Sequence, residues 1–199
     1  MRVGIDLDNT IINYEKVFYD VALEKGLINN KIEKTKTAVK NYIINDSGED
    51  NWTRLQGSVY GDSIVKAPYY DGFLDFLELA KEKNIEVFIV SHKTKYPYLG
   101  DRVNLHDSAR KWLKFNGFFE KEYLINENVF FRVTKDEKVS KISELSLDFF
   151  IDDLSEILLH DSFPSNTKKL HFNFEKHSSL LNFNNWHDIS SYIFINDYK

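Results

Sequence analysis

Residues 3–10 read Val3-Gly4-Ile5-Asp6-Leu7-Asp8-Asn9-Thr10, so a short apolar run leads directly into two closely spaced carboxylates. Valine and isoleucine favour strands, whereas asparagine and threonine favour turns. We therefore expect a strand that ends near Asp6 and a turn that follows it at once. The carboxyl ends of the strands in an open α/β sheet are where such proteins bind their ligands. Asp6 and Asp8 are thus predicted to lie at a binding edge.

The spacing of the two carboxylates is open to more than one interpretation. They repel each other unless a cation lies between them or one of them holds a proton. A divalent cation that prefers oxygen ligands, such as Mg²⁺, would relieve this repulsion. The plainer alternative is a solvated turn after a buried strand. A calcium loop is excluded, because it requires glycine and glutamate at the positions that Ile11 and Val17 occupy.

The composition is that of a folded protein with a substantial core. The chain has 199 residues, of which 42% are hydrophobic and 15% aromatic, and this argues against disorder. The net charge of −5 provides no basic footprint for nucleic acid, and no apolar run approaches the about 20 residues of a membrane span. Cysteine is absent, which excludes disulfides and thiolate sites and fits a reducing environment. We expect a cytoplasmic protein that binds neither nucleic acid nor membranes.

The pattern of apolar residues predicts an α/β architecture with a parallel sheet. Strands are expected at residues 2–6, 85–90, 123–125, 129–131, 147–151 and 170–174. Segments with helical periodicity, such as residues 71–84 and 188–194, lie between or after these strands. A strand, a connection that contains a helix, and a second strand form the βαβ unit of parallel sheets.

Residues 14–66 differ in character from the rest of the chain. They are mostly polar, rich in asparagine, lysine and aspartate, and interrupted by Gly48, Gly57 and Gly61. Residues 47–50 are expected to form a loop. We interpret residues 14–66 as a small, mostly helical insert, which leaves residues 1–13 and 67–199 as the α/β core.

Three predicted strands end in polar side chains that a parallel sheet would bring to one edge: Asp6 and Asp8, Ser91 and His92, and Asp152 and Asp153. A charged segment, Thr134-Lys135-Asp-Glu-Lys138, opens the helix before the strand at residues 147–151. Because the carboxyl ends of parallel strands lie along the same edge, residues far apart in the sequence should meet there.

This arrangement resembles the haloacid dehalogenase superfamily over residues 1–160, apart from the insert. The counterparts of its four motifs stand here as Asp6-Leu-Asp8-Asn-Thr10, Val87-Phe-Ile-Val-Ser91, Lys138 and Phe149-Phe-Ile-Asp152-Asp153. Each motif alone is weak, but the four occur in the right order, each at the expected strand end or helix start. The resemblance implies a Rossmann-like parallel sheet flanked by helices. It also implies that the insert after the first strand is a cap that lies over the active site and selects the substrate.

The resemblance further implies a magnesium-dependent phosphatase that acts through an aspartyl-phosphate intermediate. Asp6 would attack phosphorus, a known role for a carboxylate. Asp8 would protonate the leaving oxygen and then activate water. Mg²⁺ would be held by Asp6, the backbone carbonyl of Asp8 and Asp152, with Asp153 acting on the cation directly or through water.

Phosphate would be bound by Ser91, Lys138, Thr10 and His92. Lys135 and Lys141 compete with Lys138 for this role, since a shift of about one helical turn exchanges them. Plainer alternatives exist for each group. Ser91 could cap a helix or turn, Lys138 could be a surface lysine, and Asp153 could cap the following helix. His92 could orient its loop instead of binding a ligand.

More narrowly, the chain resembles small hydrolases associated with bacterial surface-glycan and sugar biosynthesis. The residues behind this are Trp52-Thr-Arg-Leu-Gln56-Gly, Tyr60-Gly61, Ser91-His-Lys-Thr94, Tyr96-Pro97 and Asp152-Asp-Leu154. This favours a sugar phosphate as the small phosphorylated substrate. A nucleotidase remains an alternative, since the catalytic residues do not distinguish the two substrate classes. A non-catalytic binding protein of the same fold is a second alternative, and the oligomeric state is open.

Overall fold

The computed structural model describes residues 1–195, which divide into two units by their internal contacts. The first unit contains residues 1–12, 69–92 and 118 onward, and the second contains residues 13–68 and 93–117. The second unit thus includes the insert predicted at residues 14–66. It also includes residues 93–117, which the sequence analysis assigned to the core. These residues group with the insert because their helix packs against it, and the indole of Trp112 donates a hydrogen bond to the carbonyl of Ala67 at 2.8 Å.

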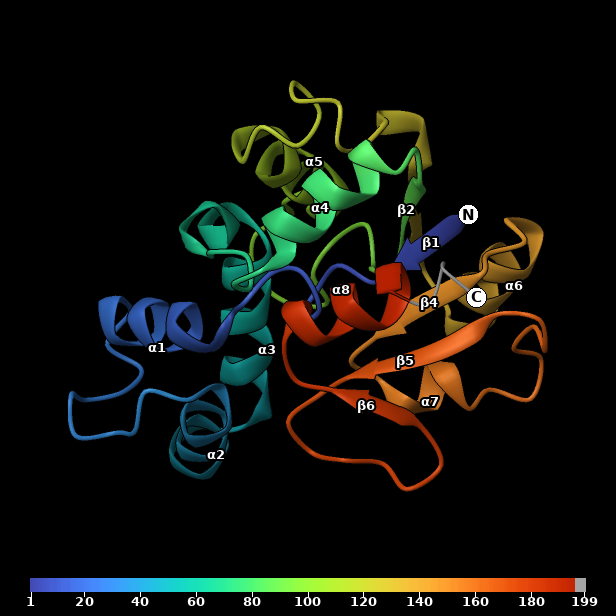
Figure 1. Cartoon of the computed structure of the whole chain (residues 1–199). Coiled ribbons are helices and arrows are strands. Elements are labelled where there is room, and N and C mark those ends of the chain that lie inside the picture. The colour runs from blue at the N-terminus through green and yellow to red at the C-terminus, as the bar shows by residue number, and fades with distance from the viewer. Residues whose placement is uncertain (196–199) are drawn as a thin grey trace. The chain divides into compact units, whose positions relative to one another are not determined.

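The first unit is built on one parallel sheet, in which six strands of the described chain run in the order β3-β2-β1-β4-β5-β6 (Figure 1). The strands are β1 (Arg2–Ile5), β2 (Glu86–His92), β3 (Val129–Arg132), β4 (Phe149–Asp152), β5 (Lys168–Phe172) and β6 (Leu181–Phe183). β1 pairs with β2 on one side and with β4 on the other. The carboxyl ends of these three strands are therefore adjacent, and the predicted parallel α/β architecture is confirmed.

Helices cover both faces of this sheet. α8 (Trp186–Ile195) packs against α4 (Phe73–Glu82), and its Tyr192 contacts Phe149 of β4. The next residue, Phe150, belongs to the core cluster formed with α6 (Lys135–Glu144) and α7 (Ser155–Leu158). Consecutive side chains of a strand point to opposite faces, so α8 and the α6–α7 pair lie on opposite sides of the sheet.

Two details of the sheet differ from the sequence-based expectation. Residues 123–125 were predicted as a strand but form a turn, in which the N–H groups of Tyr123 and Leu124 both donate to the carbonyl of Phe118 at 3.0 Å. Glu122 precedes this turn with a φ of 57°. Conversely, β6 was not predicted, because it is only three residues long and has Asn182 at its centre.

The second unit is helical. It contains α1 (Glu15–Glu24), α2 (Lys36–Ser47), α3 (Glu49–Tyr60), the 3₁₀ helix η1 (Asp62–Lys66) and α5 (Leu105–Phe115). Phe18 stacks on Trp52 with ring centroids 5.0 Å apart, and Tyr60 meets Phe18 edge-on. The loop predicted at residues 47–50 is shorter than expected. Gly48 alone separates α2 from α3, and its φ of 92° breaks the helix at a residue that tolerates this conformation.

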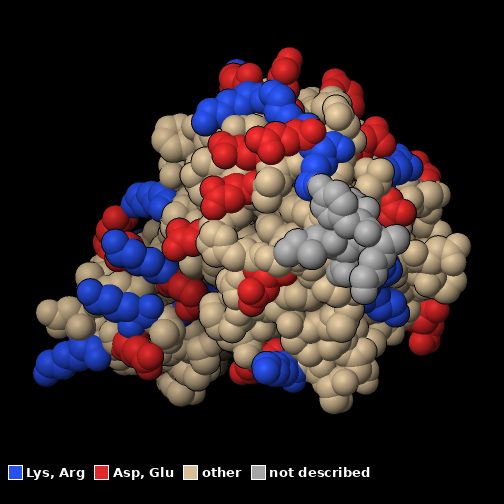
Figure 2. Space-filling view, viewed as in Figure 1, with Lys and Arg blue, Asp and Glu red and all other residues tan. Residues whose placement is uncertain are grey.

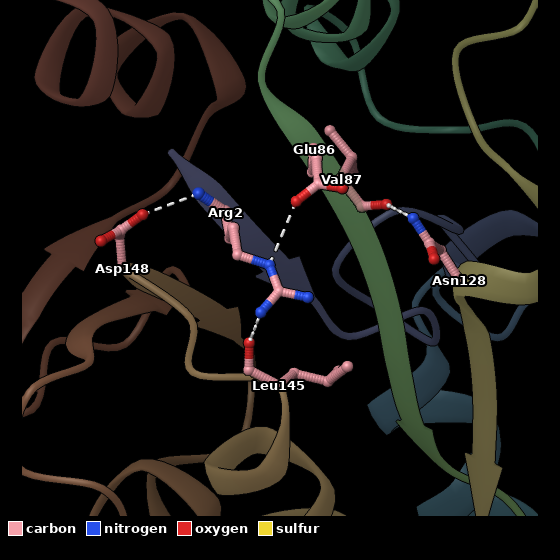
Figure 3. A network of polar contacts seen from close by, with 6 residues as sticks. All are labelled: Arg2, Glu86, Val87, Asn128, Leu145 and Asp148. Atoms are coloured by element: carbon pink, nitrogen blue, oxygen red, sulfur yellow. Dashed lines mark hydrogen bonds and ion pairs between the residues drawn. The ribbon is translucent and has the colours of Figure 1, made fainter.

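Arg2 anchors the amino end of the sheet, opposite the edge that carries the polar residues (Figure 3). Its backbone N–H donates to Asp148 Oδ2 at 2.7 Å, and its guanidinium donates to Glu86 Oε2 at 3.2 Å and to the carbonyl of Leu145. These contacts tie the start of β1 to the start of β2, to the end of α6 and to the residue before β4. They help to fix the register of the three strands whose other ends form the candidate site.

The described helices include no candidate membrane span. None of them combines the length and the apolar character that a bilayer span requires. On the face drawn in Figure 2, lysine and arginine side chains are interspersed with aspartate and glutamate side chains. This mixture is in keeping with the modest net charge of −5.

Gly4 in β1 is required by close packing, which leads to a first prediction. A Cβ atom at this position would collide with Leu147 Cδ1 and lie 2.7 Å from Phe150 Cδ2. Gly4→Ala should lower the free energy of unfolding by about 1–3 kcal/mol, the usual cost of overpacking. Urea denaturation measures this change. In a Leu147→Ala background, Gly4→Ala should lower the free energy of unfolding by less. An equal decrease in both backgrounds would contradict a steric conflict with Leu147.

Candidate functional site

Asp6 is placed by the end of β1 and by the turn that follows it. Its N–H donates to the carbonyl of Ile151 in β4 at 2.9 Å, which keeps the chain in the sheet up to this residue. The carbonyl of Leu7 then accepts hydrogen bonds from Ile11 and Ile12 at 3.0 Å, and Asn9 takes a φ of 60°. Asparagine is among the residues that tolerate this conformation. The turn predicted after the first strand is present, and it leaves Asp6 almost fully buried.

The acidic pair after β4 lies beside Asp6. Asp6, Asp152 and Asp153 each offer one carboxylate oxygen, and these oxygens all lie within 4.8 Å of one another. Asp152 is fully buried, and its Oδ1 accepts a hydrogen bond from the N–H of Leu154 at 3.0 Å. The alternative role of Asp153 as a helix cap is not observed, because α7 is preceded by Leu154 without a side-chain cap. The carboxylates that the sequence places at two strand ends are thus brought together.

Lys138, the fourth residue of α6, reaches this cluster from the start of the helix. The helix begins with a capping box, in which Thr134 Oγ1 accepts from the N–H of Glu137 at 3.1 Å and Glu137 accepts from the N–H of Thr134 at 3.2 Å. This start directs the side chain of Lys138 toward the sheet, where it is fully buried. Its Nζ lies 2.6 Å from Asp6 Oδ1 and 2.6 Å from Asp152 Oδ2.

The two competing lysines have other partners. Lys135 pairs with Glu156 and Lys141 pairs with Glu144, each at 2.6 Å. Among these three lysines, Lys138 is therefore the one that contacts Asp6 and Asp152.

The electrostatics of the cluster follow from burial and crowding. Burial raises the pKa of the Asp6 carboxyl to about 7; the Lys138 ammonium opposes this, and the charges of Asp152 and Asp8 add to it. Burial alone would lower the pKa of Lys138, but the Asp152 and Asp6 carboxylates outweigh it and hold that pKa above its ordinary value. Lys138 thus brings one ammonium group to a cluster of three carboxyl groups, those of Asp6, Asp152 and Asp153, and contacts the first two. Such a set of oxygen donors with surplus negative charge fits a divalent cation such as Mg²⁺.

Two hydroxyl groups near these strand ends have unused hydrogen-bonding capacity. Thr10 Oγ1 and Ser91 Oγ are buried and have no hydrogen-bond partner among the described residues. Thr10 follows β1, and Ser91 lies near the carboxyl end of β2. A buried polar group without a partner costs about 1–3 kcal/mol, so both hydroxyls are suited to accept or donate a hydrogen bond when a polar ligand arrives.

The remaining predicted residues, Asp8 and His92, lie outside the three-carboxylate group. Asp8 is partly exposed, and its side chain is not part of the group formed by described residues. His92 Nε2 lies 2.8 Å from the carbonyl of Val133, so this ring nitrogen is occupied by the segment that leads into α6. The predicted roles of Asp8 in proton transfer and of His92 in phosphate binding stay predictions.

Two residues that were not predicted from the sequence contact the turn formed by Asp152 and Asp153, here named the acidic turn. Asn173 and His171 both lie 3.1 Å from the backbone carbonyl of Asp153, through Asn173 Nδ2 and His171 Nε2. The available signal was a histidine inside the apolar strand at residues 170–174. Its relation to Asp153 could not be inferred without the order of the strands.

Lys138 gives a second prediction. Lys138→Met should lower the free energy of unfolding by about 3–5 kcal/mol, because it leaves two buried carboxylates without their ammonium partner. Chemical denaturation in metal-free buffer measures the change. Lys135→Met is the matched control on the same helix, and it should have little effect because its ion pair is exposed. Equal losses in the two variants would contradict the assignment of Lys138 to the buried cluster.

Two curated proteins are similar to the chain over most of its length. No protein-family model matches the chain. A protein of Bacillus cereus that is provisionally named a nucleotidase is 24% identical over 165 residues, which cover 79% of each chain. A protein of Oceanobacillus iheyensis with the same provisional name is 23% identical over 202 residues, covering 94% of this chain and 96% of the relative.

Solved structures with the same fold cover nearly the whole chain. A HAD-superfamily hydrolase from Ehrlichia chaffeensis has a TM-score of 0.57 at 19% identity and covers 96% of this chain and 95% of its own. A HAD family hydrolase from Deinococcus radiodurans, crystallised with bound phosphate and sodium, has a TM-score of 0.61 at 10% identity and covers 96% and 94%. The chain therefore has the fold of the haloacid dehalogenase superfamily, as its four sequence motifs predicted.

Proposed function

We propose that the protein is a phosphomonoester hydrolase that acts on a small phosphorylated metabolite through an aspartyl-phosphate on Asp6. The observation that carries this proposal is the buried contact of Asp6 with Lys138, next to Asp152 and Asp153 at the carboxyl edge of a parallel sheet. The names of the curated relatives and the fold support the same reaction class. A purely structural ion pair would not require a third carboxylate within reach.

Asp6 is the nucleophile in this proposal. Its carboxylate would attack phosphorus, and the leaving oxygen would depart from the opposite side with the proton that Asp8 supplies. In the second step Asp8 would take a proton from water, which then releases phosphate from Asp6. Asp8 suits this exchange because it is partly exposed and can reach solvent protons.

The other side chains bind and neutralise the phosphoryl group. Lys138 would offset the negative charge of Asp6 and Asp152, so that an anionic substrate is not repelled. Thr10 and Ser91 would use their unpaired hydroxyls for phosphoryl oxygens, with His92 as a further candidate. Mg²⁺ would be held by Asp6, Asp152 and Asp153 together with the backbone carbonyl of Asp8, and it would supply charge neutralisation when bound.

The substrate class has two candidates. The narrower sequence resemblance favours a sugar phosphate, whereas both curated relatives carry a nucleotidase name. The catalytic residues are compatible with either, because they address only the phosphoryl group. The cap predicted at residues 14–66 would select between them.

Asp6 provides the test of the mechanism. Asp6→Asn should abolish phosphate release, since the amide is a poor nucleophile, while circular dichroism and the unfolding transition show a folded protein. The matched control is Asp136→Asn, which changes an exposed aspartate of α6 that pairs with His160. The control should retain activity. Near-normal turnover by Asp6→Asn would contradict the nucleophile assignment.

The substrate class and the metal can be tested in one experiment. Phosphate release should be measured from sugar phosphates, nucleoside monophosphates and a generic aryl phosphate, with and without Mg²⁺. We expect release that requires Mg²⁺ and that is restored after treatment with a chelator when Mg²⁺ is added back. A preference for one substrate class decides between the two candidates, and release that is unaffected by chelation would contradict the proposed cation.

A further inference from the structure

The backbone carbonyl of Asp153 is held by side chains from the neighbouring strand region. Asn173 Nδ2 donates a hydrogen bond to this oxygen at 3.1 Å, and His171 Nε2 lies 3.1 Å from it. His171 belongs to β5 and Asn173 follows that strand directly. Two side chains thus converge on the turn that carries Asp152 and Asp153.

The orientation of Asn173 is fixed by a second hydrogen bond. Its Oδ1 accepts from the N–H of Glu175 at 2.9 Å, so its Nδ2 is the atom that faces Asp153. The backbone N–H of Asn173 also donates to the carbonyl of Phe183 in β6 at 2.8 Å. Asn173 is therefore attached to β6 on one side and to the acidic turn on the other.

His171 is fixed in a similar way through Asn182. The amide of Asn182 donates to the carbonyls of His177 and Leu180 at 2.8 and 2.6 Å, and its Oδ1 accepts from the N–H of His177 at 2.8 Å. These contacts orient Oδ1, which lies 2.9 Å from His171 Nδ1. The buried ring of His171 thus lies between two acceptors, Asn182 Oδ1 and the carbonyl of Asp153. A neutral ring has one N–H, so it donates to one of these two oxygens at a time.

The strand register places these groups in one row. His171 lies opposite Asp152 in the β4–β5 pairing, and Asn182 lies opposite His171 in the β5–β6 pairing. A continuous set of polar contacts therefore runs from β6, at the edge of the sheet, to the acidic turn. It ends at the backbone carbonyl of Asp153 and not at a carboxylate group.

We propose that Asn173 and His171 are positioning residues that hold the Asp152–Asp153 turn in the arrangement that binds a divalent cation. This inference rests on the proposed function of the acidic cluster. The carboxylates of Asp6, Asp152 and Asp153 repel one another. Lys138 contacts Asp6 and Asp152 directly, whereas Asn173 and His171 contact the backbone of the third residue, Asp153. Fixing the carbonyl of Asp153 keeps the carboxylate oxygens within 4.8 Å of one another. Partners that orient metal ligands typically contribute 10–100-fold to metal affinity.

The test is the affinity for Mg²⁺, measured by titration calorimetry without substrate. Asn173→Ala should raise the Kd for Mg²⁺ by about 10-fold or more, in the range expected for groups that orient ligands. His171→Phe should act in the same direction, and His171→Gln, which keeps a hydrogen-bond donor, should be affected less. The control is Asn185→Ala, which removes comparable hydrogen bonds at the start of α8, including the one from the N–H of Asp188 at 2.9 Å. It should leave the Kd unchanged.

Activity gives a second readout. The phosphate release lost in Asn173→Ala should return as the Mg²⁺ concentration is raised, whereas the KM for substrate at saturating Mg²⁺ should match that of the unaltered protein. A general structural defect would not be reversed by Mg²⁺.

The possible outcomes separate this inference from the proposed function. Weakened Mg²⁺ binding by Asn173→Ala with an unaffected Asn185→Ala supports the positioning role, even if no phosphate ester tested is hydrolysed. An unchanged Kd in folded Asn173→Ala overturns the positioning role and leaves the hydrolase proposal intact. Absence of Mg²⁺ binding by the unaltered protein overturns both the positioning role and the proposed cation.

Discussion

The ammonium group of Lys138, held between Asp6 and Asp152, is the interaction on which the rest of the site depends. Its Nζ lies 2.6 Å from an oxygen of each carboxylate, and all three side chains are almost completely shielded from water. A buried charge is tolerated only when it is paired, so each of these groups requires the others. The contact also joins α6, β1 and β4, which are distant in sequence. The same ion pairs that balance the charge of the cluster therefore also hold these three elements of the first unit together.

The order of the strands makes this contact possible. β1 lies between β2 and β4 in a parallel sheet, so the residues at their carboxyl ends are neighbours even though the connections between them are long. Arg2 secures the opposite end of the same strands (Figure 3). Gly4 allows Leu147 and Phe150 to pack directly against β1, two residues before Asp6. The acidic turn after β4 receives further support from β5 and β6.

Much of this arrangement could be predicted from the sequence, because strand ends and turns leave local signals. Asp6 and Asp152 were placed correctly at strand ends, since each directly follows an apolar run. The choice among Lys135, Lys138 and Lys141 could not be made, because burial depends on which face of α6 meets the sheet. The contact of His171 and Asn173 with the carbonyl of Asp153 depends on the order of the strands, which the periodicity of the sequence does not reveal. The strand predicted at residues 123–125 was wrong. An apolar sequence can also form a turn, and here the backbone N–H groups donate to the carbonyl of Phe118 instead of pairing with a strand.

Covalent labelling of Asp6 would decide whether the cluster is a catalytic centre. The protein should be mixed with a radiolabelled phosphate ester and Mg²⁺, stopped rapidly during turnover, digested and mapped. We expect the label on the peptide that contains Asp6, and specifically on this aspartate. Label on a different residue, or steady phosphate release with no label on any peptide, would contradict the assignment of Asp6 as the nucleophile.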